Sequence, residues 1–164
     1  MARWYPLESA DAGVFDTAAH VFRYELHYDA PPDVVWTSLA CDNSLADWSS
    51  SIQEVHWSSP RPFGVGTTRE VVAPLGLTRI REQFFRWDEG VGYSFFVSET
   101  NAPLFRRFAE DYAVAPDGTG TRFTWTVAVD PRHALRLPFQ LLAPAIKAGF
   151  GRMAADGQRY FADR

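Results

Sequence analysis

Residues 107–129, RFAEDYAVAPDGTGTRFTWTVAV, decide the fold of this chain. Two segments of alternating apolar and polar residues flank Pro116-Asp117-Gly118-Thr119-Gly120, a run that is typical of a β-hairpin turn. If this turn is short, Glu110 lies opposite Val127 and Tyr112 opposite Trp125 on one face of the hairpin. The other face carries Arg122, Thr124 and Thr126, and we expect it to be the solvent side.

The same alternation recurs along the chain and predicts further strands. Turn sequences at Pro74-Leu75-Gly76 and Glu89-Gly90 separate two pairs of them. Together with the hairpin they make a meandering antiparallel sheet of seven strands. The predicted strands are His20 to Asp29, Ile52 to Trp57, Thr67 to Ala73, Thr78 to Trp87, Gly92 to Ser98, Arg107 to Val114 and Thr121 to Val129.

Helices are predicted at two places. Pro32 to Ala40 begins with a proline in the first helical turn, and a second short turn follows the capping residues Asp42-Asn43-Ser44 and ends near Trp48. Residues 138–162 have apolar positions three and four apart, which predicts one long amphipathic helix. We expect its stripe to bury Leu142, Ile146, Phe150 and Met153, and Pro144 to kink or divide it.

Length, charge and cysteine content exclude several classes of protein. A chain of 164 residues is one domain of ordinary size; residues 1–19 form an N-terminal arm and 20–164 the domain. A net charge of −4 argues against nucleic acid as a partner. The single cysteine, Cys41, fits a reducing compartment, and the sequence lacks a signal peptide and a long apolar run. We expect a cytoplasmic monomer or homodimer without stable membrane insertion.

The order of these elements resembles that of the SRPBCC superfamily. Four stretches carry the resemblance, which covers about residues 20–162 and is strongest for the bacterial polyketide cyclase/dehydrase branch. It implies the α+β helix-grip fold, in which a curved antiparallel sheet wraps a long C-terminal helix and leaves a cavity between them. The stretches are Ala30-Pro31-Pro32-Asp33-Val34-Val35-Trp36, Gly64-Val65-Gly66-Thr67-Thr68-Arg69, Glu82 to Asp88, and Gly120-Thr121-Arg122-Phe123-Thr124-Trp125.

Hairpin pairing predicts which side chains face this cavity. Around Leu75-Gly76, Arg69 lies opposite Glu82 on the face that Val71 and Ile80 identify as buried. Most of the inward side chains are apolar or aromatic, as a small-molecule site requires. The expected ligand-binding residues are Arg69, Glu82, Phe84, Tyr93, Phe95, Phe108, Phe123, Trp125, Ile146 and Phe150, and the catalytic candidates are Glu110 and Tyr112.

Each polar residue among them has two interpretations. Arg69 and Glu82 either satisfy each other as a cross-strand ion pair or orient a ligand. Glu110 has no evident inward cation, so burial favours its neutral acid form, unless a bulge turns it outward. Tyr93 and Tyr112 are either wall residues whose hydroxyl groups are hydrogen-bonded or proton donors in a reaction.

Other chemistries lack sequence support. The histidines form no metal-binding pattern, and Gly64-Val65-Gly66 lacks the third glycine of a dinucleotide fingerprint. We expect no metal and no cofactor. Three functions remain open: binding of a small hydrophobic molecule such as a lipid, an isoprenoid or an aromatic polyketide; a polyketide cyclase or dehydratase that uses Glu110 or Tyr112 for proton transfer; and a regulatory or antitoxin-like protein that uses Trp4 and Tyr5 of the arm.

Overall fold

A computed structural model describes residues 3–162. Residues 1–2 of the predicted arm and 163–164 of the predicted domain lie outside the described residues. The strands are β1 (Tyr5–Pro6), β2 (His20–Tyr28), β3 (Glu54–Trp57), β4 (Thr68–Val72), β5 (Arg79–Asp88), β6 (Gly92–Thr100), β7 (Phe105–Asp117) and β8 (Gly120–Pro131). The helices are α1 (Val14–Thr17), α2 (Pro32–Ala40) and α3 (Arg136–Ala162), with single 3-10 turns η1 (Ser44–Asp47), η2 (Pro74–Gly76) and η3 (His133–Leu135).

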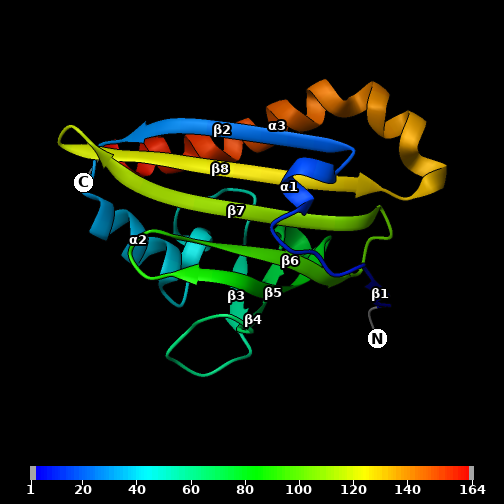
Figure 1. Cartoon of the computed structure of the whole chain (residues 1–164), viewed down its shortest axis with the longest axis horizontal. Coiled ribbons are helices and arrows are strands. Elements are labelled where there is room, and N and C mark those ends of the chain that lie inside the picture. The colour runs from blue at the N-terminus through cyan, green and yellow to red at the C-terminus, as the bar shows by residue number, and fades with distance from the viewer. Residues whose placement is uncertain (1–2, 163–164) are drawn as a thin grey trace.

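The strands form one antiparallel sheet in the order β2-β8-β7-β6-β5-β4-β3. Helix α3 lies behind β2 and β8, so the sheet and this helix make the helix-grip arrangement (Figure 1). The predicted α+β fold is therefore confirmed. The strand count was one too low, because β1 pairs with β6 as an eighth strand. A strand of two residues has no periodicity from which to predict it.

The predicted hairpin register is confirmed. Arg69 pairs with Glu82 and Val71 with Ile80 between β4 and β5. Glu110 pairs with Val127 and Tyr112 with Trp125 between β7 and β8. Phe84 pairs with Phe95 between β5 and β6, and a register shift follows between Phe84 and Arg86. The turns at Leu75-Gly76 and Gly118-Thr119 are as short as their sequences suggest, whereas the turn at Glu89-Gly90 is one residue longer, since Asp88 pairs with Gly92. The register shift compensates for this residue, so the two faces of the sheet are assigned correctly over most of its length.

The solvent side of the last hairpin is only partly exposed, which corrects the prediction for Thr126. Arg122 is exposed, but Thr126 is buried, as is Ala128 farther along β8. Val14 of α1 packs there against Ala128, so the N-terminal segment covers this part of the outer face. The sequence of the segment has no regular period that would have predicted this cover.

Trp4 and Tyr5 contact the domain itself. The guanidinium of Arg81 lies 3.9 Å from the ring centroid of Trp4. Tyr5 pairs with Thr100, and both aromatic residues are only half exposed. The two rings are therefore less exposed than the regulatory alternative assumed.

Helix α3 is continuous, so Pro144 lies inside it and does not divide it. The predicted stripe was wrong at Leu142, which is 57% exposed, whereas Ile146, Phe150 and Met153 are half-buried against the core. The fully buried residues of α3, Ala154, Gly157 and Phe161, all lie in its second half. No helix within residues 3–162 is long and apolar enough to cross a bilayer.

Candidate functional site

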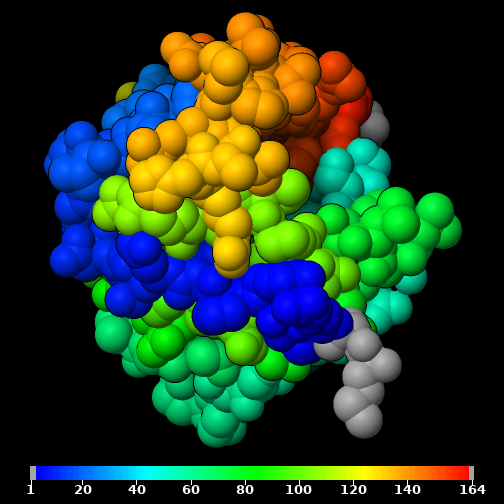
Figure 2. Space-filling model, turned by 90° about the vertical axis from the view of Figure 1, so that its right-hand side faces the viewer, coloured from blue at the N-terminus to red at the C-terminus, as the bar shows by residue number. Residues whose placement is uncertain are grey.

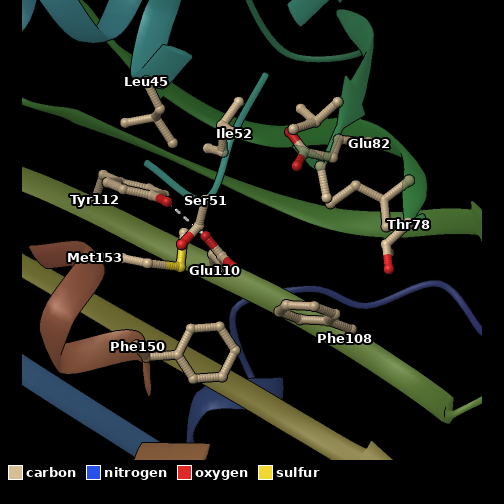
Figure 3. Close-up of a pocket in the computed structure, with 13 residues that line it drawn as sticks. Leu45, Ser51, Ile52, Thr78, Glu82, Phe108, Glu110, Tyr112, Phe150 and Met153 are labelled. Atoms are coloured by element: carbon tan, nitrogen blue, oxygen red, sulfur yellow. Dashed lines mark hydrogen bonds between the residues drawn. The ribbon is translucent and has the colours of Figure 1, made fainter. Parts of the chain in front are cut away.

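A cavity of about 150 Å³ lies between the sheet and the middle of α3. Strands β4, β5 and β7 supply one side of it, and Phe150 and Met153 of α3 supply another (Figure 3). Most of the lining is apolar, and its two carboxyl groups belong to Glu82 and Glu110. The lining residues are Leu45, Ser51, Ile52, Val71, Ala73, Thr78, Ile80, Glu82, Phe108, Glu110, Tyr112, Phe150 and Met153.

The structure brings some of the predicted site residues to this cavity and places others behind its wall. Glu82, Phe108, Glu110, Tyr112 and Phe150 line it. The other predicted residues pack in the surrounding core, outside the lining; they are Arg69, Phe84, Tyr93, Phe95, Phe123, Trp125 and Ile146.

Sequence reasoning missed several residues of the lining. Leu45, Ser51 and Ile52 come from the irregular chain between α2 and β3, where there is no alternation to read. Val71 and Ile80 could have been found, because the hairpin pairing had already placed both on the buried face. Met153 was expected in the buried stripe of α3, and the structure places it in the cavity lining as well.

Glu110 is buried, at 6% exposure, and is held by two aromatic donors. The hydroxyl of Tyr112 donates to Oε2 of Glu110 at 2.6 Å, and the indole nitrogen of Trp125 donates to the same oxygen at 3.0 Å. Within residues 3–162 no cation forms an ion pair with it. The carboxyl therefore faces inward, and the alternative of an outward-turning bulge is wrong.

The protonation of Glu110 follows from this setting. Its pKa is raised to about 8, first by burial and second by the nearby charge of Glu82, while the hydrogen bonds from Tyr112 and Trp125 act in the opposite direction. At neutral pH the acid form therefore predominates. Oε2 accepts both hydrogen bonds, so Oε1 is the oxygen left to carry the proton toward the cavity.

Arg69 and Glu82 form a buried ion pair across β4 and β5. The Nε of Arg69 lies 2.5 Å from Oε2 of Glu82, and the two side chains are 1% and 3% exposed. Burial disfavours the charged guanidinium, but Glu82 together with Tyr93 and Tyr112 raises the pKa of Arg69 on balance. The interpretation as a self-satisfied pair is therefore correct for Arg69, which lies behind Glu82 as seen from the cavity.

Ser44 completes the environment of this pair. Its Oγ accepts a 3.0 Å hydrogen bond from Arg69 and donates one of 2.8 Å to the carbonyl oxygen of Leu39. The backbone of Ser44 has a φ of 40°, a conformation that residues other than glycine adopt only when their surroundings enforce it. Its sequence context predicted only a helix cap, so its link to Arg69 was missed.

Four aromatic rings surround the guanidinium of Arg69. The distances to their centroids are 5.0 Å for Trp57, 5.1 Å for Phe84 and Phe95, and 5.7 Å for Tyr93. Such contacts stabilise a desolvated cation through the negative faces of the rings. The aromatic content of the chain thus serves partly to hold this charge.

The arrangement offers limited chemistry. Glu110 can donate a hydrogen bond or a proton to a group inside the cavity, and Glu82 provides a compensated negative charge. Burial raises the pKa of Tyr112 well above its ordinary value, so its hydroxyl stays protonated. The described part of the chain has no group of three or more His, Cys, Asp or Glu side chains placed to hold a metal ion.

Comparison with known proteins agrees with this architecture. Residues 19–158 match the family described as polyketide cyclase / dehydrase and lipid transport. Uncharacterized proteins of Mycobacterium tuberculosis and Mycobacterium bovis are each 30% identical over 156 residues, which cover 95% of this chain and 93% of each relative.

Solved structures share the fold at low sequence identity. A START superfamily protein from Mycobacterium smegmatis has a TM-score of 0.73 and 10% identity, over 88% of this chain and 99% of its own. A protein from Thermus thermophilus has a TM-score of 0.70 and 19% identity, over 88% and 98% of the two chains. The chain therefore belongs to the polyketide cyclase/dehydrase and lipid transport family of the SRPBCC superfamily.

Proposed function

We propose that this protein binds a small hydrophobic molecule that carries one hydrogen-bond acceptor, such as a carbonyl group. The observation that supports it most is the apolar cavity into which Glu110 presents a carboxyl oxygen that is free of protein partners among the described residues. A volume of about 150 Å³ is enough for one aromatic ring or a short chain. The proposal therefore favours a single ring, or one end of a longer isoprenoid or lipid, over a fused polyketide.

The acid form of Glu110 selects the polar group of the ligand. A protonated carboxyl donates a hydrogen bond, and a ligand carbonyl accepts it without bringing a charge into the cavity. A ligand with no polar group would leave this donor unsatisfied, which is unfavourable in an apolar site. Glu82 is already satisfied by Arg69 and needs nothing from the ligand.

Three ligands of similar shape test this proposal. Acetophenone carries a carbonyl group, ethylbenzene has no polar group, and 1-phenylethylamine is a cation at neutral pH. We expect acetophenone to bind most tightly near pH 6, as measured by calorimetry or by the rise in Tm. Above about pH 8 the affinity for acetophenone falls because Glu110 ionises, and the affinity for the amine rises.

The variant Glu110→Gln is the matched control. Its amide oxygen can accept from Tyr112 and Trp125, and its NH2 group still donates into the cavity, so it keeps the preference for acetophenone without the pH dependence. Equal affinity of wild type for acetophenone and ethylbenzene at pH 6 would contradict the role of Glu110. Failure of all three to bind, together with no small molecule released from the purified protein in native mass spectrometry, would contradict ligand binding itself.

A cyclase or dehydratase is the second proposal, and the neutral Glu110 beside Tyr112 favours it. A carboxyl that is still protonated near neutral pH is suited to protonate a leaving hydroxyl or a carbonyl oxygen. Such an enzyme would lose about 100- to 10,000-fold in rate in Glu110→Gln while ligand affinity stays. Recovery of a bound ligand unchanged after incubation favours the carrier.

For both proposals we favour a cytoplasmic location, since a free thiol at Cys41 suits a reducing compartment.

A further inference from the structure

The first half of α3 has the composition of a helix that lies on a lipid surface. Residues 136–150 read RLPFQLLAPAIKAGF, in which the polar side chains are Arg136, Gln140 and Lys147. At 3.6 residues per turn these three lie within about 40° of one another around the helix axis. The rest of the circumference is apolar, which in a soluble protein is typical of a helix that is covered on most sides.

One side of this segment is nevertheless uncovered. Leu137, Leu141 and Leu142 are 66%, 73% and 57% exposed, and Pro144, Ala145 and Ala148 are exposed beside them. No residue of α3 before Ala154 is fully buried. Figure 2 shows the beginning of this helix, in orange, standing out at the surface of the molecule.

The charged residues within this stretch of the sequence have one sign. No Asp or Glu occurs between Asp130 and Asp156, whereas Arg132, Arg136, Lys147 and Arg152 lie in that interval. None of these four forms an ion pair with any residue between 3 and 162, and three of them, Arg136, Lys147 and Arg152, are exposed. The guanidinium of Arg132 instead donates to the carbonyl oxygens of Phe105 and Pro6. In contrast, eight other arginines are paired with carboxylates; they are Arg61, Arg69, Arg79, Arg81, Arg86, Arg106, Arg107 and Arg159.

We propose that residues 136–152 dock this protein on an anionic lipid bilayer, with Leu137 and Leu141 entering the interface and the exposed basic side chains of Arg136, Lys147 and Arg152 contacting lipid phosphates. Exposed leucines and concentrated positive charge are the two requirements for such binding. The net charge of the whole chain is −4, so only a local surface of this kind can attract an anionic membrane. A second copy fits this face less well, because a two-fold interface would bring the basic side chains of both copies together.

Vesicle sedimentation with the full chain tests this proposal. We expect binding to vesicles of phosphatidylcholine and phosphatidylglycerol in a three-to-one mixture, and much weaker binding to phosphatidylcholine alone. The double variant Arg136→Gln/Lys147→Gln should weaken binding about 10- to 30-fold, from about 1 kcal/mol per basic residue. Raising the salt to about 1 M should have a similar effect, because it shortens the screening length to about 3 Å. Leu137→Gln/Leu141→Gln should weaken binding by at least about tenfold, from the loss of buried apolar area.

Matched controls separate this surface from general effects. Leu77 is as exposed as Leu141, at 73%, but it lies in the turn between β4 and β5, outside the proposed docking segment. Leu77→Gln should therefore leave vesicle binding unchanged. Arg122 is exposed on β8 and forms no ion pair among residues 3–162, so Arg122→Gln should also have little effect. Equal binding to both vesicle types, an equal loss in the control variants, or a dimer in sedimentation analysis that Leu141→Gln dissociates would overturn the proposal. None of these readouts depends on a ligand in the cavity.

Discussion

The phenol of Tyr112 donates a 2.6 Å hydrogen bond to Oε2 of Glu110, two residues earlier on the same face of β7. Because alternate residues of a strand share a face, this pair is positioned by one strand and needs no loop to bring it together. Trp125, opposite Tyr112 on β8, donates to the same oxygen. The proton that Glu110 carries near neutral pH is therefore directed to the other oxygen, at the cavity.

The first prediction concerns stability and pH. Burial raises the pKa of Glu110 to about 8 in the folded protein, whereas its ordinary value is 4.5. Between these values the unfolded chain releases a proton that the folded chain retains, so this group makes folding less favourable as the pH rises from about 4.5 to about 8. In Glu110→Gln this contribution is absent. We therefore expect the difference in Tm, variant minus wild type, to be larger at pH 8.5 than at pH 5.

Thermal unfolding by circular dichroism across this pH range provides the measurement. Glu25→Gln on the edge strand β2 is a suitable control, because it removes an exposed carboxyl group that lies outside the cavity. If wild type and Glu110→Gln had parallel Tm profiles, Glu110 would titrate as an ordinary surface carboxyl and its proposed role as a donor would be lost.

The second prediction concerns Arg69 and Glu82. Removing one partner of a buried ion pair leaves the other charge uncompensated, at a cost of about 3–5 kcal/mol. We therefore expect Arg69→Met and Glu82→Gln each to lower the free energy of unfolding in urea strongly, and the double variant to be more stable than the sum of the two losses implies. The surface pair Arg61 and Asp42 serves as the comparison and should show little or no coupling. Additive effects at Arg69 and Glu82 would show that the pair contributes no mutual stabilisation.

The fold and the acid pair could be predicted from the sequence because short turns fix the register of hairpins. Glu110 and Tyr112 needed only the alternation of β7 and the turn before β8. Ser44 and Ser51 could not be placed, since they lie in irregular chain whose path depends on tertiary contacts. The face of α3 was misjudged at Leu142 because a segment that is apolar almost all round has no periodicity that selects one side.

The third prediction tests which face of α3 packs on the sheet. The ring of Phe150 lies 5.5 Å from that of Trp125 and lines the cavity, so Phe150→Ala should lower the free energy of unfolding by about 2 kcal/mol, less than for a fully buried ring. Leu142→Ala, on the exposed side of the same helix, should change it by no more than about 0.5 kcal/mol. Urea denaturation of both variants measures the difference. A larger loss in Leu142→Ala than in Phe150→Ala would mean that the helix is rotated.

The last prediction uses two glycines of α3 that differ only in their surroundings. A Cβ atom on Gly157 would lie 2.5 Å from the hydroxyl oxygen of Tyr28 and 2.9 Å from a ring carbon of Trp48, whereas one on Gly149 would meet nothing within 4 Å. Alanine is favoured over glycine inside a helix by about 1 kcal/mol, so Gly149→Ala should raise the free energy of unfolding by about 0.5–1 kcal/mol.

Gly157→Ala gains the same helix propensity but must displace Tyr28, whose hydroxyl donates to the carbonyl oxygen of Ala154 at 2.9 Å. Overpacking of this kind costs about 1–3 kcal/mol, so we expect net destabilisation. Introducing Gly157→Ala into a Tyr28→Phe background should be less harmful, since the clashing oxygen is gone. Equal stabilisation by the two alanine variants in urea denaturation would mean that the second half of α3 does not contact β2 as closely as Tyr28 and Gly157 indicate.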